Sequence, residues 1–462
     1  MAQRNELDVN QFLDTRRVGA THILVVALLI LTMMVDGYDI FVVGTVAPYL
    51  AADLAIPPDS LTSVLVITQF GLMLGNFFVG PVADRYGRRF TMLWCLFAFG
   101  LLTLATPLAT TVGELFVLRF VAGLFLSGVI PNAIALVSEI MPSRVRATFV
   151  SITFAGYTLG VSVIGAPVVK WLVPKGWEYA FVVGGALPLA LAAVLYFALP
   201  ESLRFLANRR PNDARIPRQM KRMDSTLALT GSETFVVRGN TASAGKAPVA
   251  ELFRDRRWVI TLLLWTGFHM AFIVSNLLGS WRNVVLNQNG LTTDQIATIM
   301  FLPGIAGVIG TLTAGFVMER LGPTRVLPIY LGAASLSIAA VAFFDLTSIW
   351  TLLAFIVTGY FSNGGLSGIN ALASLTYPSQ MRATGVSYAH SAGRAGAIVG
   401  PFIGGAMIAA QMSAPAVFLI TAIPQMCAAL AIVAMWRMQA RPMPAASDAF
   451  TASPARTART GS

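Results

Sequence analysis

Four charged side chains lie inside stretches that are apolar enough to cross a lipid bilayer: Asp36, Asp39, Arg119 and Arg394. An ionised group in hydrocarbon costs about 2.5–3.5 kcal/mol on insertion scales, so such residues tend to serve a function and to face a partner or a cavity. Aspartate can bind and release a proton, and arginine can hold a carboxylate through its planar guanidinium group. The sequence therefore predicts a site within the membrane that handles protons and an organic anion.

Asp36 and Asp39 occur in the stretch LTMMVDGYDIFVVGTVAP, residues 31–48. Three residues apart on a helix, they share a face, and we expect them to form the proton-coupling site. Arg119 lies at a comparable depth in its own apolar segment. It is therefore a candidate partner for an aspartate or, alternatively, a direct ligand of the substrate.

Arg394 lies near the middle of its apolar segment, where no acidic residue of the second half of the chain is within reach by sequence. We expect it to hold the carboxylate of a substrate. His390 is one turn away on the same face, and His269 lies in the middle of another segment. Either histidine could relay a proton or bind the ligand, or be a hydrogen-bonded core residue.

Further polar and aromatic residues of these segments could complete the binding site. Asn132 could line the cavity, and aromatic side chains could clasp an aromatic ring. Helix-to-helix hydrogen bonds and interfacial packing explain such residues equally well. The aromatic candidates are Trp265, Tyr360 and Tyr388. The two cysteines are far apart in sequence, so we expect no metal site and no cofactor.

The positions of these residues depend on a set of long apolar segments. The chain has 462 residues, of which 56% are hydrophobic and 11% charged, whereas soluble proteins carry about 25% charged residues. Each segment of about 20 apolar residues can span a bilayer as a helix. The sequence predicts an all-α membrane protein with twelve spans, at 20–43, 62–82, 90–109, 114–140, 148–172, 179–199, 258–281, 295–318, 324–344, 348–374, 384–409 and 413–437.

Basic residues indicate the orientation. Of the 32 Lys and Arg residues, all but five lie in the two tails or in loops on the same side as the tails. Such an asymmetry places both termini in the cytoplasm of a multi-pass protein of the inner (plasma) membrane. The net charge of +11 then reflects topology, so no nucleic-acid partner is expected. The exceptions are Lys170, Lys175 and Arg282 in loops on the other side, and Arg119 and Arg394 within spans.

An internal repeat divides the chain into two halves. PSRVRAT (142–148) has a counterpart in PSQMRAT (378–384), and GPVADRYGRR (80–89) has a weaker one in GFVMERLGPT (315–324). The nearly equal offsets imply a duplicated six-span unit, with the substrate between two pseudo-symmetric bundles. The expected organisation is an N-terminal tail (1–19), a first bundle (20–199), a cytoplasmic central loop (200–257), a second bundle (258–437) and a disordered tail (438–462).

The loop GPVADRYGRR resembles the signature loop of the major facilitator superfamily, and LPESLRFL (199–206) resembles a motif that ends the sixth span in several of its branches. The superfamily fold implies alternating access. The resemblance implies a conformational latch between the halves, built from Gly80, Asp84, Arg85, Gly87, Arg88 and Arg146. Taken alone, Gly80 suggests close helix packing, and the arginines suggest charges that only set topology.

DGYDIFVVGTVAP is similar to the first span of the aromatic acid:proton symporter family, and RATGVSYAHSAGRAGAIVGPFIGG (382–405) extends the resemblance. It implies import of benzoate-like acids, hydroxylated, methoxylated or lignin-derived, by proton symport in aromatic catabolism. The chain departs from its relatives at GSWRNVV (279–285), where they usually have an apolar residue and proline after the tryptophan. Arg282 there suggests a larger or doubly charged substrate.

Other functions stay open on sequence grounds. A facilitator-type protein could export drugs or aromatic metabolites, or import sugars or organic acids, and a membrane sensor would bind a ligand without moving it. The sequence contains no HExxH, no GxSxG nucleophile elbow and no P-loop, so an enzyme is not expected. A monomer suffices for this architecture.

Overall fold

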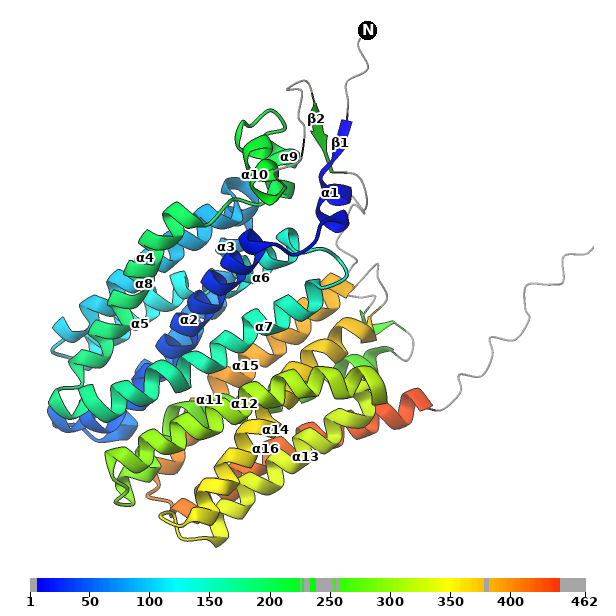
Figure 1. The fold of residues 1–462 in the computed structure, drawn as a ribbon. Helices are drawn as coiled ribbons and strands as arrows, with labels where there is room; N and C mark the ends of the chain where they lie inside the picture. The colour runs from blue at the N-terminus through cyan, green and yellow to red at the C-terminus, as the bar shows by residue number, and fades with distance from the viewer. Residues whose placement is uncertain are drawn as a thin grey trace, which may run out of the picture.

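The computed structural model is a bundle of long helices (Figure 1). It describes residues 6–224, 227, 233–237, 252–254, 257–377 and 382–440. The first half contains α2 (Ala20–Asp53), α3 (Thr62–Tyr86), α4 (Arg88–Ala105), α5 (Val112–Leu126), α6 (Val129–Ile140), α7 (Arg146–Leu159), the π-helical turns η3 (Gly160–Gly165) and η4 (Val168–Leu172), and α8 (Glu178–Ala198). The second half contains α11 (Arg257–Gln288), α12 (Thr293–Leu321), α13 (Pro323–Ala340), α14 (Ile349–Thr376), α15 (Arg382–Ala409) and α16 (Ala414–Ala440).

The predicted fold of twelve membrane-crossing helices is confirmed. Within the described residues, eleven helical segments are long and apolar enough to cross a bilayer, and α3 occupies the place of the predicted second span. Two helices run further than predicted: α2 continues through Pro48 to Asp53, and α11 continues to Gln288. Sequence hydropathy ends a span where polar residues begin, although the helix itself continues wherever the extension finds packing partners.

The ends of the bundle differ in how the two halves meet. We call the end that carries the N-terminal segment the tail face and the opposite end the far face. One apolar cluster, here the bridging cluster, joins both halves through residues such as Val42, Val46, Leu277, Trp281 and Phe418. These lie in the far-face portions of their helices. The halves are therefore joined at the far face.

Near the tail face the hydrophobic core divides. One cluster contains Leu29, Phe99 and Leu136 and belongs to the first half; another contains Phe268 and Ile432 and belongs to the second half. Each cluster is built from one half of the chain alone. The described core thus has the arrangement of a two-bundle transporter closed at the far face and parted at the tail face.

Backbone packing, more than charge, closes the far face. A Cβ on Gly44 of α2 would lie 2.6 Å from Ser280 Cα of α11, so only glycine allows this approach. Lys170 and Asp294 form an ion pair at 3.2 Å, but both side chains are exposed, and such a pair contributes at most about 1 kcal/mol. Close packing of α2 on α11 is therefore the main contact of the closed end.

The tail face carries a small ordered unit that the sequence analysis did not anticipate. Strand β1 (Glu6–Asp8) pairs in parallel with β2 (Thr234–Val236), and around them lie α1 (Val9–Thr15), α9 (Leu203–Arg209) and α10 (Arg215–Met223). Their apolar side chains form a separate cluster that includes Phe12, Phe205, Ile216 and Phe235. The expected tail at 1–19 and the expected central loop at 200–257 are thus partly folded together.

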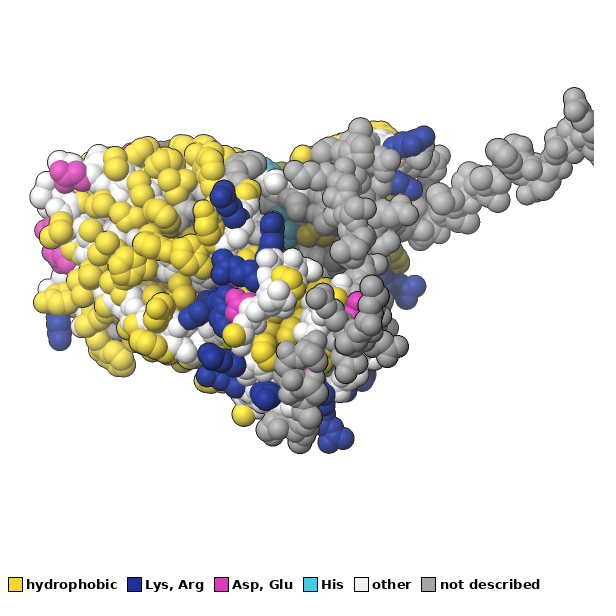
Figure 2. Space-filling view, turned by 90° about the horizontal axis from the view of Figure 1, so that it is seen from above, with side chains coloured by type: hydrophobic (Ala, Val, Ile, Leu, Met, Phe, Trp, Pro, Cys, Tyr) yellow, Lys and Arg dark blue, Asp and Glu magenta, His cyan; other side chains and the backbone are white. Residues whose placement is uncertain are grey.

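Basic side chains gather near this unit. Viewed from above, the molecule shows hydrophobic surface on the left and dark blue Lys and Arg side chains towards the centre and right (Figure 2). Arg16 pairs with Asp224 at 2.6 Å, and Arg146 lies 3.7 Å from Asp14. The predicted C-terminal tail, 438–462, lies outside the described residues from 441 onwards, and residues 438–440 end α16.

We predict that Gly44→Leu prevents closure of the far face, because a larger side chain cannot fit against Ser280. Transport falls at least about tenfold, and a cysteine placed at Thr45 reacts faster with a membrane-impermeant maleimide added on the far side. The labelling is carried out with Cys427, the exposed native cysteine, replaced by alanine.

The matched control is Gly332→Leu in α13, because a Cβ at Gly332 would meet nothing within 4 Å. It is expected to leave both transport and labelling unchanged. Equal effects of the two substitutions would show that the contact at Gly44 is not specific to closure.

Candidate functional site

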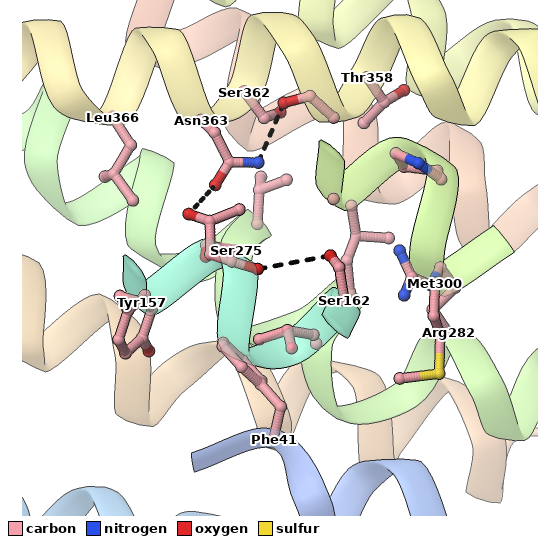
Figure 3. A pocket seen from close by; sticks show the side chains of 18 of the residues that line it. Phe41, Tyr157, Ser162, Ser275, Arg282, Met300, Thr358, Ser362, Asn363 and Leu366 are labelled. Atoms are coloured by element: carbon pink, nitrogen blue, oxygen red, sulfur yellow. Dashed lines mark hydrogen bonds between the residues drawn. The ribbon is translucent and has the colours of Figure 1, made fainter. Parts of the chain in front are cut away.

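A cavity of about 160 Å³ lies between the two halves, and residues of the bridging cluster form part of its wall (Figure 3). An apolar protein cavity of about 150 Å³ can hold a benzene ring, so this space suits an aromatic ring. The lining comes from α2, α7 and η3 of the first half and mainly from α11, α12 and α14 of the second half. Its apolar walls include Phe41, Phe154, Tyr157, Met300, Phe355 and Leu366.

Polar groups cross the cavity from one half to the other. Thr158 Oγ1 donates to Asn363 Oδ1 at 3.3 Å, and the Asn363 amide donates to Gly359 O of its own helix at 2.9 Å. Deeper in the contact between halves, Gln69 Nε2 donates to Asn276 Oδ1 at 2.8 Å. The π-helical turn η3 widens the helix at Ser162, which lines the cavity (Figure 3). Such turns often mark functional sites.

Asp39 is locked into an ion pair. Arg119 Nη2 lies 2.7 Å from Asp39 Oδ2, and Arg119 Nη1 lies 3.2 Å from Oδ1, so the two groups meet fork to fork. Thr103 Oγ1 donates to Asp39 Oδ1 at 2.8 Å. Both charged side chains are fully buried. A pair with these extra hydrogen bonds ties α2 to α4 and α5 and is costly to break.

Asp36 is also fully buried, but both of its carboxylate oxygens lack a hydrogen-bond partner among the described residues. Its electrostatic neighbours are Asp39, which repels its negative charge, and Arg394, which attracts it. Arg394 also acts on Tyr157, a residue of the cavity wall. Asp36 acts on Tyr157 as well, so the three groups are close enough to interact beside the cavity wall.

The eight predicted substrate-binding side chains, Arg394, Arg119, His390, His269, Tyr388, Asn132, Trp265 and Tyr360, lie outside the described lining of this cavity. Arg119 forms an ion pair with Asp39 instead. His269 Nδ1 lies 3.0 Å from Ala392 O, and the Asn132 amide donates to Gly128 O at 2.7 Å. These contacts tie the two residues to backbone carbonyls, on a neighbouring helix for His269 and on the adjoining turn for Asn132.

The predicted aromatic residues take part in packing. Tyr388 stacks on Trp265 with ring centroids 6.2 Å apart, and the His390 ring lies 5.3 Å from that of Phe268. Tyr360 and Thr313 share a hydrogen bond of 2.7 Å. Tyr388 and His390 are exposed. They occupy the parted tail-face half of the second bundle, where Trp265, Tyr360 and Phe268 belong to the local core.

The residues that do line the cavity include several that the sequence analysis did not assign to the site. Phe41, Tyr157 and Ser162 carried no signal beyond their place in an apolar segment. Arg282 was marked by its departure from the family pattern, and the structure places it in the cavity wall. Asn363 lines the cavity as well, whereas Asn132 does not.

The predicted latch residues interact within the first half. Arg88 Nε lies 3.4 Å from Glu139 Oε1, and the backbone N–H of Arg89 donates to Glu201 Oε1 at 3.2 Å. Gly87 ends α3 at φ +106°, which favours glycine. Gly80 does not mediate close packing, since a Cβ there would meet nothing within 4 Å.

The remaining latch residues are placed as follows. Arg85 is exposed, with its guanidinium carbon 5.4 Å from the Tyr86 ring centroid. Arg146 faces Asp14 of the N-terminal segment. The Asp84 side chain lies outside what the structure describes. The glutamates of α6 and of the stretch after α8, Glu139 and Glu201, are the described acidic partners of this basic loop.

The pattern of the Major Facilitator Superfamily matches residues 29–289 and 270–459. The chain belongs to the major facilitator superfamily. Two solved structures share the fold: a bacterial homologue of the human lysosomal transporter Spinster (TM-score 0.69, 17% identity, 93% of this chain and 100% of that one) and the xylose transporter XylE from E. coli (TM-score 0.66, 17% identity, 90% and 96%).

Similar sequences within the superfamily are aromatic acid transporters. The gallate transporter of Pseudomonas putida is 34% identical over 440 residues, 95% of this chain and 97% of that protein. The 4-hydroxybenzoate transporter PcaK of Pseudomonas aeruginosa is 33% identical over 404 residues (87% and 90%), and the benzoate transport protein of Acinetobacter baylyi is 30% identical over 446 residues (95% and 94%). The predicted membership of an aromatic acid transporter family is confirmed.

The two aspartates should differ in their effect on stability. We predict that Asp39→Asn lowers the free energy of unfolding by about 3–5 kcal/mol, because it leaves the Arg119 charge buried and unpaired. Asp36→Asn is expected to lower stability by less than Asp39→Asn, because it removes a charge that acts on Arg394 but no hydrogen bond that the described residues make with Asp36. Thermal unfolding of the purified protein in detergent measures both.

The double variant Asp39→Leu with Arg119→Leu is the control, since replacing a whole buried ion pair with apolar side chains is often neutral. It is expected to recover most of the stability that Asp39→Asn loses. Equal destabilisation by Asp36→Asn and Asp39→Asn would contradict the separation of their roles.

Proposed function

We propose that this protein imports an aromatic carboxylic acid together with protons by alternating access across the inner membrane. The observation that carries this proposal is the central cavity, whose walls are aromatic and whose Tyr157 interacts electrostatically with Arg394 and Asp36. The printed names of the relatives, which include gallate, 4-hydroxybenzoate and benzoate transporters, support the substrate class. Hydroxylated or methoxylated benzoates, including lignin-derived ones, are the first candidates.

Charge and closure together support an assignment of the two faces to the two sides of the membrane. The excess of basic residues at the tail face favours a cytoplasmic tail face with both termini inside. The far face then lies towards the periplasm, and the state described here is closed to the periplasm and parted towards the cytoplasm. This is the state from which an imported substrate would leave.

Charge neutrality couples the two ligands. In a low-dielectric site, Asp36 in its ionised form balances Arg394, so this pair is neutral when no substrate is bound. An incoming carboxylate would add a second negative charge beside one guanidinium. If Asp36 takes up a proton, the substrate carboxylate replaces it as the anion that balances Arg394. Substrate anion and proton therefore enter together, and each alone leaves an uncompensated charge.

In this scheme Asp39, Arg119 and the predicted latch residues position the helices and do not contact the substrate. Asp39 and Arg119 hold α2 in place beside the coupling site. The basic loop of residues 80–89, together with Arg146, would meet the second half when the tail face closes, which is the latch role expected for it. A single chain supplies both halves of the cavity, so a monomer suffices.

We predict that proteoliposomes containing the protein accumulate a hydroxybenzoate when an inward proton gradient is imposed, and that a protonophore abolishes the accumulation. Asp36→Asn, which cannot release a proton, removes gradient-driven accumulation but retains counterflow exchange of labelled for unlabelled substrate. Accumulation that survives in Asp36→Asn would rule out this residue as the coupling group. Uptake of sugars or cations but no aromatic acid would overturn the substrate class.

We also predict that Arg394→Ala raises the apparent KM for the carboxylate by roughly 10- to 100-fold, the usual effect of removing a charged hydrogen-bond partner. Arg394→Lys keeps the charge without the planar fork and recovers part of the affinity. Initial uptake rates over a range of substrate concentrations give both values. Wild-type affinity in Arg394→Ala would exclude Arg394 as the anchor.

A further inference from the structure

Arg282 of α11 lies in the wall of the central cavity and has no role in the scheme above (Figure 3). Its Nε is buried and has no hydrogen-bond acceptor among the described residues. The guanidinium carbon lies 6.0 Å from the centroid of the Phe355 ring. An aromatic face attracts a cation but leaves the in-plane N–H groups without acceptors. A buried cation in this state is costly unless an anion visits it.

The rest of the described cavity lining offers no such anion. Its polar members are serine, threonine, asparagine, glutamine and tyrosine, and Arg282 is the one charged side chain among them. The neighbouring Asn283 amide donates to Met300 Sδ at 3.6 Å and carries no charge. Asp294, the acidic residue at the start of α12, is engaged with Lys170. The acceptor for Arg282 must therefore come from the ligand.

A second cation, Arg394, interacts with another residue of the cavity wall. Figure 3 shows Tyr157 and Arg282 at opposite ends of the view, with Ser162 and Ser275 between them. Arg394 acts electrostatically on Tyr157. An aromatic ring in the cavity would therefore have one guanidinium beyond each end.

We infer that the preferred substrate is an aromatic dicarboxylate whose two carboxylates lie on opposite sides of the molecule, one held by Arg394 and the other by Arg282. This inference rests on the proposed function and names the substrate class more narrowly. Charge balance agrees with it: two carboxylates, two guanidinium groups and a protonated Asp36 leave the site neutral. A monocarboxylate leaves Arg282 uncompensated, and two carboxylates on adjacent ring carbons cannot reach both ends.

The test measures competition with uptake of labelled benzoate in proteoliposomes. The competitors are benzene-1,4-dicarboxylate, the longer biphenyl-4,4′-dicarboxylate, benzene-1,2-dicarboxylate and unlabelled benzoate. One of the two para-dicarboxylates is expected to inhibit at about a tenth of the benzoate concentration or less. Arg282→Gln is expected to change the ratio of the two inhibition constants by roughly 10- to 100-fold in favour of benzoate, and Arg282→Lys to change it less.

Lys170→Gln is the matched control, since it removes one positive charge near the far face outside the cavity. It is expected to leave the ratio unchanged. Thermal unfolding of Arg282→Gln and Arg282→Lys establishes that both variants are folded before the ratio is read. A ratio that changes equally in Lys170→Gln would assign the effect to overall surface charge and overturn the inference.

Two other outcomes are informative in different ways. If benzoate is transported but neither para-dicarboxylate competes better than benzoate, or Arg282→Gln leaves the ratio unchanged, the dicarboxylate inference is wrong and the proposed function stands. If no aromatic acid is transported or competes at all, the proposed function itself is wrong. Uptake of the para-dicarboxylate that competes better, measured with a labelled sample, then distinguishes a transported substrate from an inhibitor. If this compound is not transported, the inference is also overturned.

Discussion

The carboxylate of Asp36 is buried and has no hydrogen-bond donor among the described residues, and this limits how the helices around it can be arranged. It can be tolerated in hydrocarbon only if it is protonated or balanced by a nearby cation. Arg394, from the other half of the chain, is that cation. Electrostatic attraction between Asp36 and Arg394 therefore adds to the packing between the two halves. This attraction depends on the charge of Asp36.

The ion pair of Asp39 with Arg119 supports the position of Asp36, which lies one turn away on the same helix. Because Asp39 is held by a guanidinium fork and by Thr103, it has a fixed position. That rigidity holds the turn of α2 on which Asp36 lies. The bridging cluster adds to it, since α2 contributes Val42 and Val46 to the contact with α11. Asp36 thus lies on a helix that an ion pair and apolar packing both hold in place.

The sequence predicted the fold well and the site only partly. Hydropathy identified the spans because each span carries about 20 apolar residues. The repeat of PSRVRAT identified the two bundles because it recurs at the same place in each half. The intramembrane charges were recognised because a charged residue stands out within a run of apolar ones. Which aspartate pairs with Arg119 could not be read from the sequence, since two positions on one helical face differ only in what the neighbouring helices present.

The cavity lining was harder still to predict. Phe41 and Tyr157 look like any other aromatic residue of a span, and the cavity forms where α2, α7, α11, α12 and α14 meet, which depends on helix rotation. Polar candidates such as Asn132 and Tyr360 turned out to satisfy neighbouring groups within their own bundles. The folded unit at the tail face also escaped notice, because short apolar motifs such as LRFLA carry too little periodicity to stand out among polar residues.

The parallel pairing of β1 with β2 has a consequence for biosynthesis. Glu6 pairs with Thr234, so the first strand to leave the ribosome has no partner until all helices of the first half have been made. Contacts of such long sequence separation form late. The N-terminal segment can therefore take up this position only after the helices of the first half have left the ribosome. The small sheet is thus a contact between the two ends of the first half of the chain, and synthesis of that half has to precede it.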